Sequence, residues 1–149
     1  MLCARADVDE SRIGCCGLSG GGMRTTFLAG LDNRIACAVC VGMMTTWRDY
    51  LLHKAYTHTW MIYVPLLAQE LDYPEILGLR TPKPTMVLND VDDQLFTMPE
   101  MTRADTILRD VYAKAGAADH YQCSFYPGPH KFDQAMQAEA FGWLDRWLQ

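Results

Sequence analysis

The segment GLSGG at residues 17–21 matches the pattern G-x-S-x-G, which can place a serine where it acts as a nucleophile. Such a serine sits on a tight turn between a strand and a helix. Gly17 and Gly21, two residues to either side, let the strand and the helix approach closely. The N-terminus of the helix favours negative charge that develops nearby. We therefore predict that Ser19 attacks and that the Gly20 amide donates a hydrogen bond to the developing charge.

The context of this turn agrees with that prediction. Residues 11–18 form an apolar run that predicts a buried strand, and a helical stretch extends from about residue 20 to residue 31. The simplest alternative is a glycine-rich turn whose serine has no role. A phosphate-binding loop is disfavoured, because the chain contains neither G-x-x-x-x-G-K-[ST] nor G-x-G-x-x-G.

A nucleophilic serine needs a general base, and His130 is the best-placed histidine. It comes soon after a predicted strand at residues 121–126, so we expect it at the same edge of the sheet as Ser19. The other three histidines fit a surface or packing role better: His53, His58 and His120.

The base in turn needs an acid that orients it, and in chains with this turn the acid lies between the serine and the histidine. The predicted strand at residues 85–88 is followed by three candidates, Asp90, Asp92 and Asp93. An acidic loop is usually a solvated turn, because charged side chains favour the surface. Its position directly after a strand favours a role for at least one carboxylate, but the pattern alone does not select among the three.

The elements that must position these residues follow from the hydrophobic pattern. Short apolar segments without polar alternation predict buried strands at residues 11–18, 34–41, 85–88 and 121–126. Predicted helices lie between and after them, at about residues 20–31, 97–116 and 132–148. The second of these begins with TMPE, residues 97–100, which predicts a capping box. The alternation predicts an α/β fold, with about four parallel strands covered on both faces in one domain over residues 1–149.

Residues 43–80 fit this alternation less well, because they are long, rich in aromatic side chains and helical in pattern. We predict a helical insertion over the C-terminal edge of the sheet. Met43, Trp47 and Trp60, together with Leu18 beside the serine, are then candidates for an apolar substrate pocket. The alternative for the aromatic residues is ordinary packing in the core.

Composition excludes several classes of function. The net charge of −5 argues against a nucleic-acid partner. No apolar run reaches the roughly 20 residues that cross a bilayer, and the first ten residues carry charges where a signal peptide has its apolar stretch. These features predict a cytoplasmic protein without a membrane partner. Cys37 and Cys40 would point to opposite faces of a strand, so we expect free thiols and neither a metal site nor a cofactor.

Three motifs, in this order along the chain, resemble those of α/β-hydrolases, in particular the dienelactone-hydrolase and acetyl-xylan-esterase-like group. They are RIGCCGLSGGG at residues 12–22, DQLF at residues 93–96 and GPHKF at residues 128–132. The resemblance implies a serine esterase that acts on small acyl esters without a cofactor, with Ser19 as nucleophile and His130 as base. It also selects Asp93 as the acid, because the acid of that group typically precedes an x-Leu-Phe step. Asp90 stands where relatives often have glycine.

The resemblance covers only the C-terminal half of that fold, since in the family several strands precede the nucleophile turn. That first half normally supplies a second oxyanion donor, so Gly20 would need help from the Gly21 or Gly22 amide or from a partner chain. The strand at residues 11–18 would be an exposed apolar edge, which predicts a homo-oligomer, most simply a dimer. The alternatives are a weak or inactive self-associating fragment, or hydrolysis of lactones, thioesters or peptides.

Overall fold

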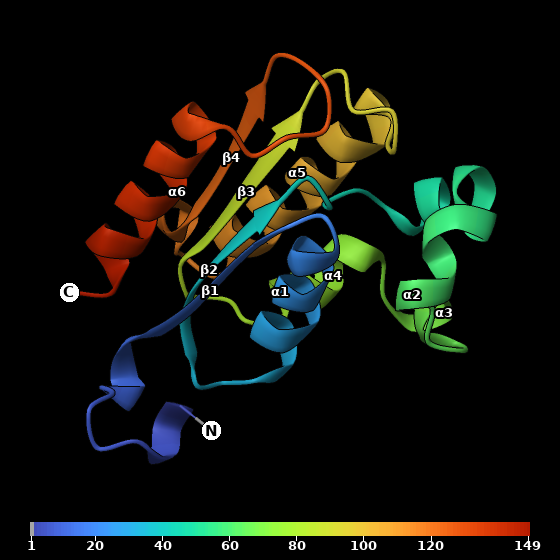
Figure 1. The fold of residues 1–149 in the computed structure, drawn as a ribbon. Coiled ribbons are helices and arrows are strands. Elements are labelled where there is room, and N and C mark those ends of the chain that lie inside the picture. The colour runs from blue at the N-terminus through green and yellow to red at the C-terminus, as the bar shows by residue number, and fades with distance from the viewer. Residues whose placement is uncertain (1) are drawn as a thin grey trace.

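Four parallel strands form a single sheet in the computed structural model, which describes residues 2–149 (Figure 1). The strands are β1 (Ile13–Leu18), β2 (Ile35–Val41), β3 (Thr85–Asp90) and β4 (Tyr121–Tyr126). Their order in the sheet is β1-β2-β3-β4, so strands that follow one another in the chain also pair with one another. The predicted α/β fold of four parallel strands is confirmed, and each predicted strand is found close to its expected bounds.

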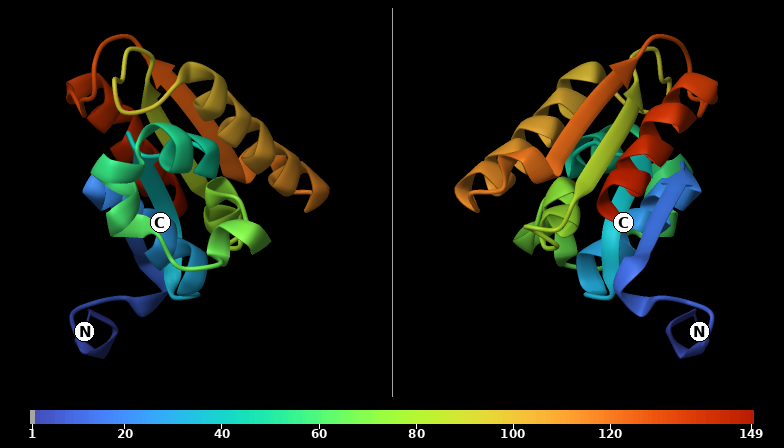
Figure 2. Two further views of the ribbon diagram at one scale, coloured as in Figure 1. Left: turned by 90° about the vertical axis from the view of Figure 1, so that its right-hand side faces the viewer. Right: turned by 90° about the vertical axis from the view of Figure 1, so that its left-hand side faces the viewer.

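Helices cover both faces of this sheet (Figures 1 and 2). One face carries α1 (Gly20–Leu31), α4 (Tyr73–Gly78) and α5 (Met98–Lys114), which contact one another or the strands, and the other face carries α6 (Gln134–Trp147). Shorter pieces complete the chain: α2 (Trp60–Ile62), α3 (Leu67–Glu70) and the 3₁₀ turns Leu2–Ala4, Glu10–Arg12 and Ala118–His120. No helix within residues 2–149 has both the length and the apolar character needed to cross a bilayer.

The apolar core is divided by the sheet into two clusters. The strand β2 shows the division most clearly, because Cys40 packs in the cluster under α1, α4 and α5 whereas Cys37 packs in the cluster under α6. This agrees with the prediction that the two thiols point to opposite faces, and both are free and buried. A strand with apolar residues on both faces belongs in the centre of a covered parallel sheet.

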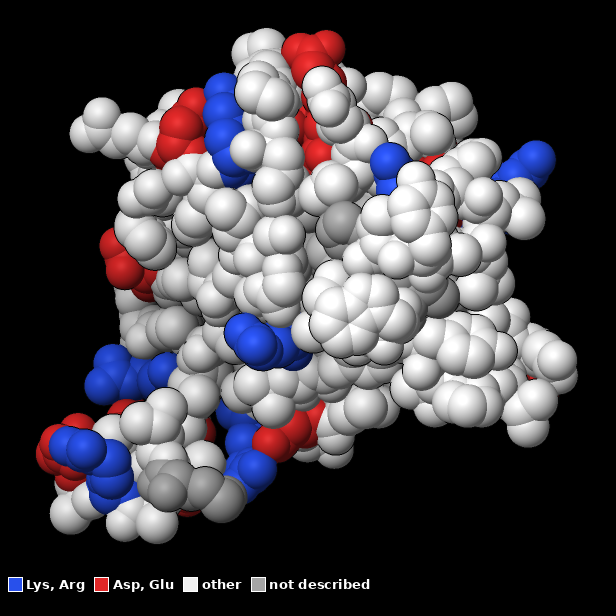
Figure 3. Space-filling model, turned by 45° about the vertical axis from the view of Figure 1, so that its right-hand side comes forward, with Lys and Arg blue, Asp and Glu red and all other residues white. Residues whose placement is uncertain are grey.

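The segment between β2 and β3 is helical only in short pieces. It contains two π-helical turns, Asp49–His53 and Ala55–Thr59, before α2 and α3. Several of its large apolar side chains are exposed, namely Leu52, Tyr56, Trp60 and Leu66. The side of the molecule that faces the viewer in Figure 3 shows few charges. The end of the segment differs, because α4 packs against α1 and α5 and so belongs to the layer that covers the sheet.

One buried carboxylate joins this segment to α5, and we call its surroundings the Asp49 junction. Asp49 is completely buried and accepts hydrogen bonds from the Thr45 hydroxyl (2.7 Å), His53 Nδ1 (2.8 Å) and the Thr97 amide (2.8 Å). The Thr97 hydroxyl also donates to it, at 3.0 Å. Four donors therefore saturate a single carboxylate.

The Asp49 junction also corrects the predicted capping box at residues 97–100. Thr97 is the N-cap of α5, as expected, but its side chain makes no capping hydrogen bond. The Thr97 hydroxyl donates a hydrogen bond to the buried Asp49 carboxylate, and Glu100 accepts one from the Thr46 hydroxyl at 2.6 Å. The Thr97 amide, which the Glu100 side chain would bind in a capping box, donates to Asp49 instead, so the tertiary contact replaces the local one. The complete capping box lies instead at the start of α4, between residues 72 and 75.

Candidate active site

Ser19 occupies the turn between β1 and α1 with an unusual backbone, at φ 56° and ψ −117°. A side chain at positive φ is strained, and such strain persists only where surrounding bonds hold it. Two bonds do so here: the Ser19 amide donates to the Val41 carbonyl, and the Met23 amide donates to the Ser19 carbonyl, each at 2.9 Å. This geometry is the one expected of the predicted nucleophile turn, with the serine at the C-terminal end of β1.

The glycines around the turn explain how strand and helix come so close. A Cβ atom at Gly17 would lie 2.4 Å from the carbonyl carbon of Gly21, and one at Gly22 would lie 2.8 Å from the Val41 oxygen. The pairing of Gly17 with Gly21 is as predicted, whereas the steric need for Gly22 was missed. At Gly20 a Cβ would meet nothing within 4 Å, so space beside the first residue of α1 is open.

His130, the predicted base, and Asp93, the acid that the resemblance implies, lie within hydrogen-bond distance of each other. The distance between His130 Nδ1 and Asp93 Oδ2 is 2.7 Å, and only 1% of the Asp93 side chain is exposed against 26% of the His130 side chain. The second Asp93 oxygen accepts from the Leu95 amide at 2.9 Å. Among the described residues His130 Nε2 has no hydrogen-bond partner, so this nitrogen is free to accept a proton.

Gly42 brings the histidine to the nucleophile turn. It directly follows β2 with φ +56°, and a Cβ atom there would lie 2.8 Å from His130 Cε1 and 3.1 Å from Leu18 Cδ1. The preceding residue, Val41, holds the amide of Ser19. The histidine ring and the nucleophile turn therefore meet across the C-terminal end of β2, and only a glycine leaves room for the ring.

Two loops carry the acid and the base, and hydrogen bonds join them. We call residues 90–93 the acid loop and residues 126–131 the histidine loop. Their bonds are Val91 amide to Tyr126 carbonyl (2.8 Å), Asp92 amide to Gly128 carbonyl (3.1 Å), Gly128 amide to Asp92 Oδ2 (3.0 Å) and Lys131 amide to Asp90 Oδ2 (3.0 Å). Each aspartate of the acid loop thus holds a different point of the histidine loop, which the sequence could not reveal.

Asp90 is the least satisfied of these carboxylates. It is completely buried, and its Oδ1 has no hydrogen-bond partner within residues 2–149. Burial raises the pKa of Asp90, with a further contribution from the charge of Asp93, against the opposing effect of the Lys131 amide and of His130. Asp90, Asp93 and His130 each offer a donor atom within 4.8 Å of the others, a spacing that could hold a metal ion. A cation there would compete with the bond between Asp93 and His130.

A cavity of about 360 Å³ opens beside the acid–base pair and is lined by Asp93, Gln94, Leu95, Pro129 and His130. The predicted pocket residues do not line it. Met43 and Trp47 are 0% and 4% exposed and belong to the core, so the packing alternative holds for them, and Trp60 is 73% exposed. Leu18 lies near the His130 ring, as described above. Gln94 and Pro129 directly adjoin the acid and the base in the chain, and this adjacency was the available signal.

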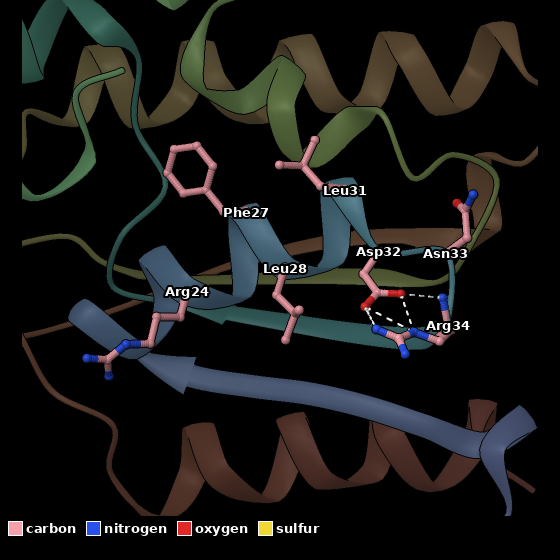
Figure 4. A pocket seen from close by; sticks show the side chains of 7 residues that line it. All are labelled: Arg24, Phe27, Leu28, Leu31, Asp32, Asn33 and Arg34. Carbon is pink, nitrogen blue, oxygen red and sulfur yellow. Dashed lines mark hydrogen bonds and ion pairs between the residues drawn. The ribbon is translucent and has the colours of Figure 1, made fainter. Parts of the chain in front are cut away.

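A larger hollow, of about 800 Å³, lies away from this site on the outer side of α1 (Figure 4). Its lining is mostly apolar, with an ion pair at one end between Asp32 and Arg34 (2.5 Å). It borders the edge strand β1 and contains none of the groups that a nucleophilic mechanism needs. The smaller cavity is therefore the candidate site, because it is lined by His130 and Asp93.

Comparisons with known proteins identify the family and the fold of this chain. The sequence profile of the prolyl oligopeptidase family matches residues 1–148. The chain is 34% identical over 148 residues to YtaP of Bacillus subtilis (strain 168), which is named as a hydrolase, and the match covers 97% of this chain and 49% of YtaP. The chain thus spans about half the length of the curated relative it matches.

Solved structures share the fold. Methylesterase BT1017 matches with a TM-score of 0.75 at 23% identity, over 97% of this chain and 32% of that protein. A glucuronoyl esterase from Solibacter usitatus matches with a TM-score of 0.78 at 16% identity, over 97% and 44%. At these identities the likeness shows the fold alone, which is that of α/β-hydrolases. The family profile covers nearly every residue, and the chain therefore belongs to the prolyl oligopeptidase family.

Proposed function

We propose that this chain carries the catalytic residues of a serine hydrolase that cleaves esters of small acyl groups, with Ser19 as nucleophile, His130 as base and Asp93 as orienting acid. The observation that carries the proposal is the pairing of His130 with the buried Asp93, which leaves Nε2 free beside the nucleophile turn. A serine becomes nucleophilic only when a base accepts its proton, and an acid behind the base holds the ring in the correct tautomer.

The reaction follows from this arrangement. Ser19 Oγ attacks the carbonyl carbon of the ester while its proton passes to His130 Nε2, and the Asp93 carboxylate stabilises the imidazolium. The carbonyl oxygen becomes negative and accepts a hydrogen bond from the Gly20 amide at the N-terminus of α1. The alcohol leaves with the proton from His130. Water then repeats the sequence on the acyl-serine and releases the acid.

Gly20 alone is an incomplete oxyanion hole. Loss of one donor from such a site typically lowers turnover by roughly 10²–10³. The Gly21 amide is a candidate second donor, because the space beside that residue is also open. A partner chain is the other source. Fast turnover in the proposed mechanism therefore requires a second donor beside the Gly20 amide.

Esters are favoured over other acyl substrates by the solved structures that share the fold, which are named as a methylesterase and glucuronoyl esterases. Family membership favours a second candidate, hydrolysis of peptide bonds, since the family is named for an oligopeptidase. The acyl-transfer machinery is common to both, and the pocket decides between them. A matched pair of substrates with the same acyl group, an activated ester and an anilide, separates the two candidates.

The assembly is part of the proposal. In the part of the chain that the structure describes, β1 pairs with β2 alone, so its outer edge offers unpaired backbone groups, and Leu28, which points toward this strand (Figure 4), is 46% exposed. A second copy is the occupant that we propose for this edge, because a two-fold axis would pair the unpaired backbone groups of β1 with those of the same strand in the other copy. Sedimentation of the native protein at micromolar concentration should give a dimer, and a clean monomer would overturn this part.

Labelling with a fluorophosphonate probe tests the nucleophile. We expect wild type to be labelled on the peptide that contains Ser19 and to hydrolyse a short activated ester, whereas Ser19→Ala should do neither. Ser11→Ala is the matched control, since Ser11 is exposed and its hydroxyl donates to the nearby Asp9. Equal hydrolysis by wild type and Ser19→Ala, or a label on a different residue, would exclude the proposed mechanism.

A further inference from the structure

Asp90 stands at the end of β3, in the acid loop, but it is not the residue that bonds the histidine ring. Its side chain is completely buried, and its Oδ2 accepts from the Lys131 amide at 3.0 Å. Lys131 directly follows His130. A hydrogen bond to the amide of the next residue therefore fixes the backbone of the histidine itself.

The other bonds between the loops hold the opposite side of the histidine. The Val91 amide binds the Tyr126 carbonyl, and Asp92 binds Gly128 through both its amide and its carboxylate. With Asp90 in place, the histidine loop is tied to the acid loop both before and after His130. Without it, the ring's own bond to Asp93 would have to hold the second side.

The carboxylate at this position is costly. Asp90 Oδ1 has no hydrogen-bond partner in the described part of the chain, and a buried polar atom without a partner costs free energy. Three ionisable groups face it: Asp93 repels its charge, whereas His130 and Lys131 attract it. If Asp90 served only to stabilise the fold, we would expect both of its carboxylate oxygens to accept hydrogen bonds. Buried polar atoms without a hydrogen-bond partner are concentrated at functional sites, where the position of a side chain matters more than its contribution to stability.

We propose that Asp90 is a positioning residue for His130: its buried carboxylate holds the Lys131 amide and so fixes the ring between Asp93 and the nucleophile turn. The inference rests on the proposed function of His130 as the base. A misplacement of about 1 Å in a catalytic group can lower the rate by roughly 10². The requirement is for a hydrogen-bond acceptor at this point, and a neutral amide of the same shape can supply one.

Substitutions separate the acceptor from the rest of the side chain. Asp90→Ala should lower kcat by about 10- to 100-fold and leave KM within about 3-fold, because the ring is displaced but the cavity is intact. Asp90→Asn keeps an acceptor and should restore kcat to within about 3-fold of wild type. Asp110→Ala, an exposed aspartate on α5, is the matched control. Should Asp90→Ala fail to fold, Asp90→Gly removes the same acceptor. The inference would be overturned if Asp90→Ala kept the kcat of wild type, or if Asp90→Asn were as slow as Asp90→Ala.

A measurement without turnover distinguishes this inference from the proposed function. The proton shared by His130 Nδ1 and Asp93 can be followed by NMR in protein labelled with ¹⁵N-histidine. We expect its signal to persist in wild type and Asp90→Asn and to broaden by exchange in Asp90→Ala. An unchanged signal in Asp90→Ala overturns the positioning role even if Ser19 reacts with the probe. A changed signal in a protein that the probe never labels supports positioning while the proposed function fails.

Discussion

Two aspartates of this chain are buried to the same degree and bonded very differently. Asp49 joins residues 43–66 to α5 and is saturated by four donors. Asp90 joins the acid loop to the histidine loop with one donor and leaves an oxygen without a partner in residues 2–149. Equal burial therefore does not mean an equal contribution to stability. A carboxylate with all its hydrogen bonds made stabilises the fold, whereas one with an unpartnered oxygen lowers the stability while it fixes the position of a neighbouring residue.

The pKa values of the two groups diverge for the same reason. Burial alone would raise the pKa of Asp49, but the hydrogen bonds from Thr97, His53 and Thr45 outweigh it, and the pKa lies below its ordinary value of 3.8. At Asp90 a single amide cannot offset burial, so the pKa lies above that value. Protonation therefore weakens the first site and relieves the second.

The largest effect on stability should come from Asp49→Ala. The change leaves the Thr45 hydroxyl and the Thr97 amide without their acceptor, and hydrogen bonds to a charged group contribute about 1.5–3 kcal/mol each. We expect the free energy of unfolding to fall by roughly 3–5 kcal/mol in urea titrations. Asp90→Ala should lose much less. If Asp90→Ala proved as costly as Asp49→Ala, the contrast between the two sites would collapse.

Gly42→Ala should lower the activity strongly while the fold is kept. The new methyl group would lie 2.8 Å from His130 Cε1, so the ring must move, and we expect kcat to fall by about 10². Gly116→Ala is the control, because Gly116 also has positive φ, +68°, but nothing lies within 4 Å of its Cβ position. Both variants share the backbone strain, whereas only the first displaces the base. Similar kcat values in the two would place the histidine ring elsewhere in solution.

The dependence of stability on pH should have opposite signs at the two aspartates. The folded pKa of Asp49 is lowered, so its contribution is present above pH 3.8 and is lost as the pH falls through the folded pKa. The folded pKa of Asp90 is raised, so the folded state is favoured at low pH and loses stability as the pH rises above 3.8 through the folded pKa. The stability of Asp90→Asn relative to wild type should therefore rise as the pH increases from 3.8 through the folded pKa of Asp90. The urea midpoint of both proteins at each pH measures this difference. A constant difference would refute the assigned direction.

The same contrast explains what the sequence could predict. Ser19 and His130 follow from a local pattern and from strand order, because the ends of parallel strands share one edge of the sheet. The pattern left three candidate aspartates, and only the family resemblance selected Asp93. The hydrogen bond from the Thr97 hydroxyl to Asp49 could not be predicted from the sequence, since the two residues are far apart in the chain and the local pattern at 97–100 favours a capping box. Gly42 carried no signal either, because its need for space comes from a histidine that arrives from β4.

The smallest effect should come from His53→Ala, which tests how much of the Asp49 junction depends on its exposed partner. The His53 side chain is 48% exposed, so solvent screens its ion pair with Asp49, and such pairs contribute about 0–1 kcal/mol. We expect a loss below about 1 kcal/mol in the free energy of unfolding, because Thr45 and Thr97 still saturate the carboxylate. A double-mutant cycle with Asp49→Asn isolates the pair. A loss of about 2 kcal/mol or more, with a coupling of the same size, would show that His53 is a structural member of the junction. Stability would then depend on His53 in the exposed helical segment as well as on Thr45 and Thr97.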